Sequence, residues 1–210
     1  PPRWPSGRSG VLQTGPEARW AGSGAGATPA LSEVRRYTRT SWRWNRPGYD
    51  VADGVPHQRI ENRVLPAGPT VIDVLANTAF FFGAMRGLAE EERPVWSQMP
   101  FHAAQHNLYA GARLGMDAHL YWPTIGWTRP DELVLRTLLP LAHEGLRNCG
   151  MSDAARERYL AVIEQRCITR RTGASWQRTT VQTLPNNGAD RPGPPATMLG
   201  GYREHLHAHQ

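Results

Sequence analysis

Charged and uncharged side chains alternate along the segment Arg59-Ile60-Glu61-Asn62-Arg63. On a β-strand, side chains two positions apart share a face, so Arg59, Glu61 and Arg63 are predicted to point the same way. At a rise of about 3.3 Å per residue, the carboxylate lies roughly 7 Å along the strand from each guanidinium. Such a row is suited to magnesium and phosphate, because Mg²⁺ takes carboxylate and phosphate oxygens and arginine neutralises phosphate charge. A solvent-facing strand with weak ion pairs is the simpler alternative.

The elements that must position this row follow an α+β pattern. Alternation predicts strands within Glu33–Pro47, His57–Leu65 and Asp117–Pro123. Apolar residues at helical spacing predict helices over Val71–Leu88, Ser97–Leu114, Pro130–Asn148 and Asp153–Arg170. The first helix is entered through Thr70 with Asp73 as its capping-box partner, and the last begins after Ser152. The first is also apolar nearly all round, which is typical of a central helix.

Proline and glycine divide the chain into four parts. Residues 1–30 contain 11 Gly or Pro and no apolar periodicity, which predicts a disordered head. Residues 31–184 form the folded body, and 185–196 are a Pro/Gly-rich loop. Residues 197–210 form a C-terminal tail that is expected to be a frayed helix at most.

Composition narrows the classes of function. The chain has 210 residues, and its 24 basic side chains are all arginine, so an anion must be held by guanidinium groups, backbone amides or metal. The net charge of +6 comes mostly from residues 1–50, which argues against a specific nucleic-acid surface on the nearly neutral body. Neither a membrane span nor a signal peptide is predicted, which favours the cytoplasm. The two cysteines, Cys149 and Cys167, are expected to be reduced core thiols.

Two groups of histidines are weaker candidates for metal binding. His102 and His106 could share a metal on one helix face, but "HAAQH" lacks a zinc-peptidase glutamate, which favours structural or surface histidines. The alternating tail residues His205, His207 and His209 are expected to bind metal only adventitiously.

A polar loop is predicted around "TRRTGASWQ", which contains Arg170, Arg171 and Gln177. Its glycine could let the backbone approach a ligand, or its arginines could complement the dipole of the preceding helix, and both alternatives stay open. Six tryptophans of the body are expected to pack rather than to stack on bases. They are Trp42, Trp44, Trp96, Trp122, Trp127 and Trp176.

Several blocks together resemble the C-terminal half of the glutamate–cysteine ligase type 2 family, the carboxylate–amine ligases. They are "RWNRPGYD", "GVPHQRIENRVLPAGPTVIDVLANTAFFFGAMRGLAEEERPVWSQM", "DAHLYWP", "DELVLRTLLPLAHEGL" and "IEQRCITRRTGASWQ", with a weaker similarity in "YREHLH". The resemblance implies a partial glutamine-synthetase-like catalytic domain, with antiparallel strands packed against a helical layer. It also implies that Glu61 ligates an active-site Mg²⁺, and that Arg59 and Arg63 contact nucleotide phosphate or the acyl-phosphate intermediate.

The implied reaction joins glutamate to cysteine, a step toward low-molecular-weight thiols such as glutathione. ATP phosphorylates the γ-carboxylate of glutamate, and the amine of cysteine attacks the acyl phosphate, because a carboxylate alone is a poor electrophile. The expected cofactors are ATP and Mg²⁺, and the expected partners are the small-molecule substrates, with a homo-oligomer left open.

Family members are longer, and their N-terminal half supplies further metal-binding carboxylates, so this chain is expected to be incomplete and inactive alone. Two alternatives are a catalytically silent remnant that acts as a packing or association module, and a ligase for a different amine.

Overall fold

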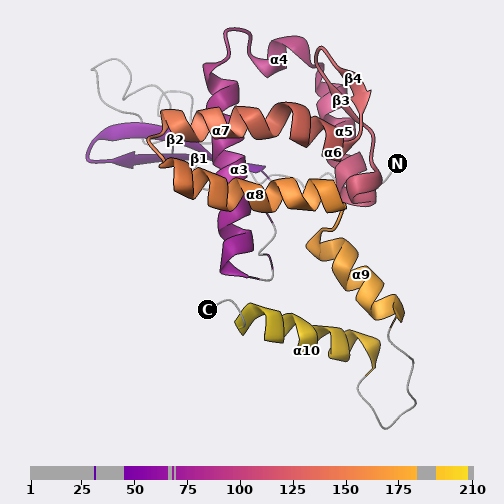
Figure 1. Cartoon of the computed structure of the whole chain (residues 1–210). Helices are drawn as coiled ribbons and strands as arrows, with labels where there is room; N and C mark the ends of the chain where they lie inside the picture. Colours follow the sequence, from indigo (N-terminus) through magenta and orange to yellow (C-terminus); the bar gives the residue numbers. More distant parts are fainter. Residues whose placement is uncertain (1–30, 32–44, 66–67, 69, 184–192, 208–210) are drawn as a thin grey trace, which may run out of the picture. The chain divides into compact units, whose positions relative to one another are not determined.

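The computed structural model describes residues 31, 45–65, 68, 70–183 and 193–207, of which 205–207 are described by backbone only. This part of the chain is mixed α+β and mostly helical, with two small antiparallel sheets, which confirms the predicted class (Figure 1). The chain divides into two units, Pro1–Leu65 and Pro66–Gln210. The predicted head, residues 1–30, lies outside the described residues.

The first unit contains a β-hairpin. Strands β1 (Asn45–Ala52) and β2 (Val55–Asn62) pair antiparallel across the two-residue turn Asp53-Gly54. Both turn residues have positive φ, as a type I′ turn requires, and Asp-Gly is a preferred pair for it. β2 confirms the strand expected within His57–Leu65. Of the segment Glu33–Pro47, only the last three residues are described, and they lie in β1.

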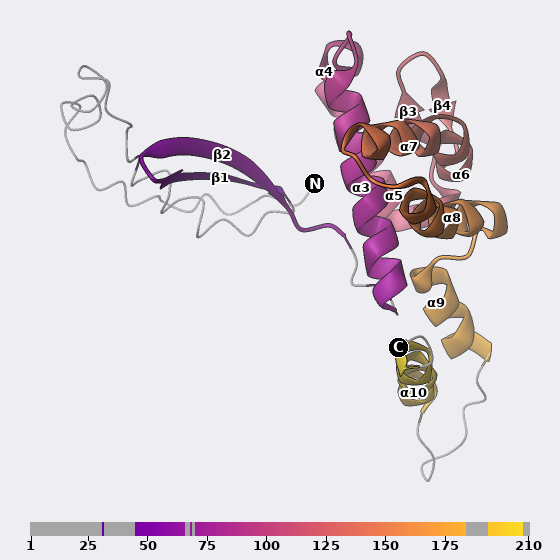
Figure 2. The same cartoon turned by 60° about the vertical axis from the view of Figure 1, so that its left-hand side comes forward.

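The second unit is organised around helix α3 (Val71–Glu90). α3 crosses α7 (Leu139–Asn148) and α8 (Asp153–Thr169), which lie beside each other (Figures 1 and 2). The central position predicted for α3 is confirmed by its contacts with both helices, but the helix is buried on one face only. Side chains from all three helices form one buried cluster, made of Ala76, Ala79, Leu139, Ala142, Leu146, Leu160 and Ile163.

The backbones of α3 and α7 touch where three glycines meet. A Cβ built on Gly145 would lie 2.1 Å from the carbonyl oxygen of Gly83 and 2.8 Å from the amide nitrogen of Gly87. A Cβ on Gly83 would lie 2.5 Å from the carbonyl oxygen of Ala142. Real Cβ atoms do not approach backbone this closely, so the crossing requires residues without a side chain.

This contact decides which face of α3 is buried. Its buried residues are Ala76, Ala79, Gly83 and Gly87, whereas Phe82 is 61% exposed. The large apolar residues at helical spacing therefore do not form the packed face. Among the described helices, α3 alone is long and apolar enough to cross a bilayer. This is only weak evidence for a membrane span, because core helices of soluble proteins share that length and composition.

The expected helix starts are confirmed by their caps. Thr70 Oγ1 accepts from the Asp73 amide at 3.2 Å, and Asp73 Oδ2 accepts from the Thr70 amide at 3.1 Å, which completes a capping box. Ser152 Oγ accepts from the Ala155 amide at the start of α8. These local bonds satisfy amides that have no partner within the helix.

The prediction of a single helix over Ser97–Leu114 is wrong. The structure has two helices there, α4 (Val95–Gln98) and α5 (Phe101–Leu114), separated at Pro100. Proline lacks an amide proton and disfavours helical geometry at the residue before it, so the helix ends at that point.

Helical structure is continuous over the predicted span Pro130–Asn148. It consists of α6 (Pro130–Leu133), a π-helical turn η2 (Val134–Leu138) and α7. Pro140 lies just after the π turn and cannot donate to the carbonyl four residues earlier, which is a reason for the altered hydrogen-bond pattern.

A second small sheet follows α5 and the 3₁₀ turn η1 (Gly115–Asp117). Strand β3 (Leu120–Trp122) confirms the strand expected within Asp117–Pro123, and it pairs with β4 (Gly126–Thr128), which the sequence analysis missed. The Asn107 amide ties this sheet to α5, because it donates to the Tyr121 carbonyl and accepts from the Tyr121 amide, each at 2.7 Å.

The polar loop expected around Gly173 is wrong, because helix α9 (Gly173–Thr183) begins there. Thr172 and Ser175 cap it reciprocally: Thr172 Oγ1 accepts from the Ser175 amide at 3.1 Å, and Ser175 Oγ accepts from the Thr172 amide at 2.8 Å. Helix α10 (Pro194–His207) then begins within the stretch 185–196 that was assigned to a loop.

Both cysteines are free thiols, as expected, but only one lies in the core. Cys167 is buried, and burial raises the pKa of its thiol to about 11. The core placement is wrong for Cys149, which is exposed because it lies at the C-terminal end of α7.

Arg170 joins the end of α8 to two other elements. It adopts the left-handed conformation after α8, and its guanidinium donates to Asp131 Oδ2 at 2.8 Å, to the Met116 carbonyl at 2.8 Å and to Asp117 Oδ1 at 2.7 Å. Arg129 also pairs with Asp131. Hydrogen bonds from Arg129, and then from Arg170, lower the pKa of Asp131 to about 2.

Adding one methyl group at Gly145 tests the contact between α3 and α7. We expect Gly145→Ala to lower the free energy of unfolding by about 3 kcal/mol, because the helices must separate to admit the Cβ atom. Urea unfolding monitored by circular dichroism measures the difference.

Gly111→Ala is the matched control, because a Cβ there has no atom within 4 Å outside its own helix. This variant should be stabilised by about 0.5–1 kcal/mol, since alanine favours the helix. Equal stability of the two variants would show that the glycine contact is not tight.

Acid should weaken the ion pairs that Asp131 forms with Arg129 and Arg170. Its pKa lies below the ordinary carboxyl value of about 4, so its stabilisation is complete above that pH and is lost as the pH falls toward 2. Asp131→Asn should lower the free energy of unfolding at neutral pH by about 2 kcal/mol and flatten this acid limb. Urea unfolding across that pH range measures both effects.

Glu144→Gln is the comparison, because Glu144 forms an exposed pair with Arg147. Its loss should change stability by less than about 0.5 kcal/mol. An acid limb unchanged in Asp131→Asn would contradict the assigned role of Asp131.

Candidate functional site

Glu61 lies between two arginines in the hairpin. Arg63 Nε donates to Glu61 Oε1 at 3.0 Å, and Arg46, the cross-strand partner of Glu61, pairs with the other carboxylate oxygen. The Glu61 side chain is 40% exposed. We call Arg46, Glu61 and Arg63 the Glu61 cluster.

Arg59 lies on the same strand but is not bonded to Glu61. Its guanidinium lies 3.1 Å from His57 Nε2, and its side chain crosses Gly48 on β1, where a Cβ would lie 3.2 Å from the Arg59 Cγ. Of the two arginines predicted to flank Glu61, Arg63 is therefore bonded to it, whereas Arg59 is bonded to His57.

The Glu61 cluster is electrostatically suited to an anion. Two guanidiniums surround one carboxylate, so the formal charges of these three side chains sum to +1, and Arg46 and Arg63 each take part in further interactions. The hydrogen bond from Arg63, followed by that from Arg46, holds the pKa of Glu61 below its ordinary value. Phosphate oxygens fit such a cluster, because arginine binds them through paired hydrogen bonds.

A magnesium ion by itself does not fit this cluster. Its one carboxylate already accepts from two cations, and no group of three His, Cys, Asp or Glu side chains suitable for a metal occurs among the described residues. Mg²⁺ prefers several oxygen ligands, so further oxygens, such as those of a nucleotide, would have to accompany it.

Arg46 is the member of the cluster that the sequence analysis missed. The signal that identifies it is the Asp53-Gly54 turn, because a two-residue turn at that point pairs position 46 with position 61. Alternation along one strand cannot show a partner on the next strand.

A large cavity of the second unit lies beside α9, and we call it the α9 pocket. Its volume is about 1060 Å³. Residues of α3, α8, α9 and α10 line it together with Gly68 and with Arg171 and Thr172, which connect α8 to α9. They are Asp73, Asn77, Ala161, Val162, Gln165, Arg166, Thr169, Arg171, Thr172, Gly173, Ala174, Trp176, Gln177 and Tyr202.

An ion pair forms one polar wall of the α9 pocket. Arg166 of α8 pairs with Asp73 of α3 and donates to Asn77 Oδ1 at 2.6 Å. Asp73 also caps α3, so the position of Arg166 depends on the helix start. The pKa of Asp73 is lowered by its bonds to Thr70 and Arg166, although partial burial opposes the shift.

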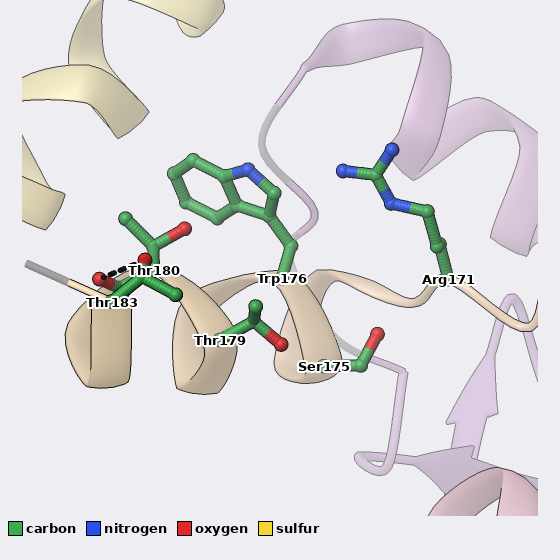
Figure 3. A pocket seen from close by; sticks show the side chains of 6 residues that line it. All are labelled: Arg171, Ser175, Trp176, Thr179, Thr180 and Thr183. Carbon is green, nitrogen blue, oxygen red and sulfur yellow. Dashed lines mark hydrogen bonds between the residues drawn. The ribbon is translucent and has the colours of Figure 1, made fainter.

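Arg171 and Trp176 lie at the start of α9 and project to the same side of it (Figure 3). They line the α9 pocket and also a smaller neighbouring cavity of about 270 Å³. The Trp176 ring lies 6.3 Å from the Tyr202 ring, at an angle of 45°. The other members of the smaller cavity all carry hydroxyl groups, and they are Ser175, Thr179, Thr180 and Thr183.

The three polar residues predicted to share a loop around Gly173 have different surroundings in the structure. Arg170 links helix ends through Asp131, whereas Arg171 and Gln177 line the α9 pocket. Trp176, expected only to pack, lines the pocket as well. Two other tryptophans expected to pack are largely exposed, Trp96 at 76% and Trp127 at 57%.

Among the residues that the structure describes, His102 and His106 belong to no group of three or more potential metal ligands. His102 and His106 are exposed on α5, and the His106 ring packs edge-on against Trp127 at 4.8 Å. The side chains of His205, His207 and His209 lie outside the described residues, as do Trp42 and Trp44.

No protein-family model, curated protein or solved structure matches this chain.

The Glu61 cluster can be tested by titration. We expect Arg63→Gln to raise the pKa of Glu61 toward its ordinary value, because the hydrogen bond from Arg63 is the largest cause of its lowering. NMR observation of the side-chain carboxyl carbon during a pH titration measures this shift.

Arg59→Gln is the matched control, since Arg59 bonds to His57 instead. It should leave the pKa of Glu61 nearly unchanged. An equal rise in both variants would contradict the pairing described above.

Proposed function

We propose that the chain is part of an ATP-dependent carboxylate–amine ligase that forms a γ-glutamyl amide from glutamate and cysteine. The observation that carries the proposal is the Glu61 cluster, in which two arginines of the hairpin region bond to one carboxylate on an antiparallel strand. The sequence blocks that resemble the glutamate–cysteine ligase type 2 family support it, and so does the mixed α+β class. The finer proposal is that the hairpin and the helices belong to a glutamine-synthetase-like catalytic domain.

The proposed chemistry requires two anions to come together. The γ-carboxylate of glutamate attacks the terminal phosphorus of ATP, ADP leaves, and an acyl phosphate forms. The amine of cysteine then attacks the acyl carbon, loses a proton and releases phosphate. Arg59 and Arg63 bind phosphate oxygens in this proposal and reduce the repulsion between the anions, and Arg46 joins them.

Glu61 has the role of magnesium ligand in this proposal. Bound Mg²⁺ would supply charge neutralisation at the phosphates. Because Glu61 already accepts from two arginines, the proposal requires those bonds to be exchanged for bonds between arginine and phosphate. No covalent bond to the protein is needed.

A second proposal is that the chain is a catalytically silent association module. The observation that favours it is that the carboxylate of Glu61 is already paired on a partly exposed strand. Exposed apolar side chains on α3 and α5, such as Phe82 and Phe101, support the same proposal. A ligase that joins a different amine is the remaining variant of the first proposal.

ADP release distinguishes these proposals. The whole gene product that contains this chain should form ADP only when ATP, Mg²⁺, glutamate and cysteine are all present. Glu61→Ala should lower turnover by at least about 100-fold, the scale expected for loss of transition-state charge stabilisation. The assay couples ADP formation to a spectroscopic signal.

Arg113→Gln, an exposed substitution on α5, should retain full turnover. Full turnover of Glu61→Ala would contradict the role of Glu61. If no ADP forms with cysteine but another amine supports the reaction, the amine assignment is wrong. If no amine supports ADP formation and the chain self-associates in sedimentation, the second proposal, a catalytically silent association module, is supported instead of the ligase.

A further inference from the structure

We propose that the outer edge of β2 pairs antiparallel with the same edge in a second copy of this chain, about a two-fold axis at Ile60. The result is a four-stranded sheet in which Arg59 lies opposite Glu61 of the partner subunit. The inference goes beyond the ligase proposal, because it needs neither nucleotide nor turnover. It stands on the hairpin, and it gives the association module a partner and a surface.

The register of the hairpin determines which amides of β2 point outward. Ala52 and Val55 close the two-residue turn, so the amides of β2 point alternately toward β1 and away from it, starting with Val55 toward β1. Pro47 and Pro56, which have no amide proton, both fall on outward positions, as this alternation requires. The outward amides of β2 are those of Gln58, Ile60 and Asn62.

These three amides form an open strand edge. No residue that the structure describes accepts a hydrogen bond from them. β2 is exposed from Val55 to Ile60, and Ile60 itself is 68% exposed. A two-stranded hairpin alone is only marginally stable in water, and an unpaired strand edge is a template for another strand. The exposed edge of β2 is therefore suited to a further strand.

The outer edge of β1 is less available. Pro47 has no amide proton, and the Val51 amide donates to Asp50 Oδ1 at 3.0 Å. Tyr49, between them, takes part in a further interaction. Pairing through β2 therefore ends at four strands instead of continuing into a fibre, and it gives the closed two-fold symmetry that is commonest among dimers.

Charge complementarity selects the register of the new pair. With the axis at Ile60, Arg59 lies opposite Glu61 of the partner subunit, and this pair occurs twice. Gln58 then lies opposite the partner's Asn62, and Ile60 lies opposite its own copy. An axis at position 59 or 61 would place two arginines or two glutamates directly opposite each other, which is unfavourable. The pair of Arg59 and Glu61 is also of the non-hydrogen-bonded type, in which side chains approach most closely.

The paired segment has defined ends. Beyond residues 58–62, Pro56 would lie opposite the partner's Val64. Pro56 has no amide to donate, and the Val64 amide already donates to Asn62 Oδ1 at 3.0 Å. Pairing of residues 58–62 thus leaves no outward amide of this edge without an acceptor. An axis at Gln58 or Asn62 would instead oppose Ile60 to one of these two blocked residues.

Glu61 has the capacity to accept a further arginine. Its carboxylate accepts from Arg63 and pairs with Arg46, whereas a carboxylate offers about four lone-pair positions. Arg59 bonds to His57, and because this contact is exposed it is readily exchanged. The second copy thus brings an Arg59 to Glu61, to which the Arg59 of the same chain is not bonded.

Sedimentation equilibrium of the whole chain over a concentration series tests the proposal. The parent chain should dimerise, and Ile60→Lys should weaken dimerisation at least about tenfold, because two ammonium groups would face each other across the axis. Val55→Lys is the matched control, since Val55 is 64% exposed on the same strand but lies outside the paired segment. It should dimerise as the parent does.

Three results of this measurement would overturn the proposal. They are a monomeric parent chain, equal loss of dimerisation in both lysine variants, and a dimer that survives Ile60→Lys. The last result would place the contact elsewhere, such as on the exposed apolar side chains of α3.

An exchange of charge tests the register. Arg59→Glu and Glu61→Arg should each dimerise at least about tenfold more weakly than the parent, because like charges then lie opposite. An equimolar mixture of the two variants should dimerise as the parent does, since both pairs of opposite charge are rebuilt across the axis. Circular dichroism verifies that each variant is folded. A mixture of folded variants that stays monomeric would contradict the register.

Crosslinking tests the same axis without a change of charge. In a Cys149→Ser background, Ile60→Cys should form a covalent dimer with oxidised glutathione, because opposed residues of a hydrogen-bonded pair have Cα atoms about 5.5 Å apart, within disulfide range. Val55→Cys should not, although it is similarly exposed. Equal crosslinking of the two would contradict the axis. Because these measurements use no ATP, glutamate or cysteine substrate, failure of dimerisation and failure of ligation are distinguishable.

Discussion

The direct backbone contact between α3 and α7 is the constraint on which the helical unit depends. Gly83, Gly87 and Gly145 allow two helices to meet with no side chain between them, and the buried cluster forms around that contact. The crossing uses small residues, so the large apolar residues of α3, such as Phe82 and Met85, are left on the outer face. The apolar character of α3 therefore serves the core on one face only.

Ion pairs between helices then determine where the candidate site lies. Arg166 in the last turn of α8 and Arg170 directly after it link the C-terminal end of this helix to α3 and to α6. The next residues, Arg171 and Thr172, lead directly into α9. The α9 pocket thus depends on a chain of local bonds: a cap on α3, an ion pair to α8, a left-handed residue at its end and a second cap on α9.

Arginine is the only strong cation available to either site, because the chain has no lysine. In the hairpin, arginines surround a carboxylate, whereas Arg171 has no described partner. The Glu61 cluster and the α9 pocket therefore differ in whether a carboxylate already occupies the arginine. An anion must displace Glu61 from its bonds at the first site, whereas at the second it meets a guanidinium to which no described residue is bonded.

The sequence by itself determined the features that depend on neighbours in the chain. The predictions of the Thr70 and Ser152 caps, of helices α3 and α8 and of strand β2 are confirmed, because capping bonds and side-chain periodicity act over a few residues. Tertiary structure alone decided which face of α3 is buried, and it brought Asp73, Arg166 and Trp176 to one pocket. The physical reason is that these contacts join residues about 90 positions apart, and no local pattern records such a distance.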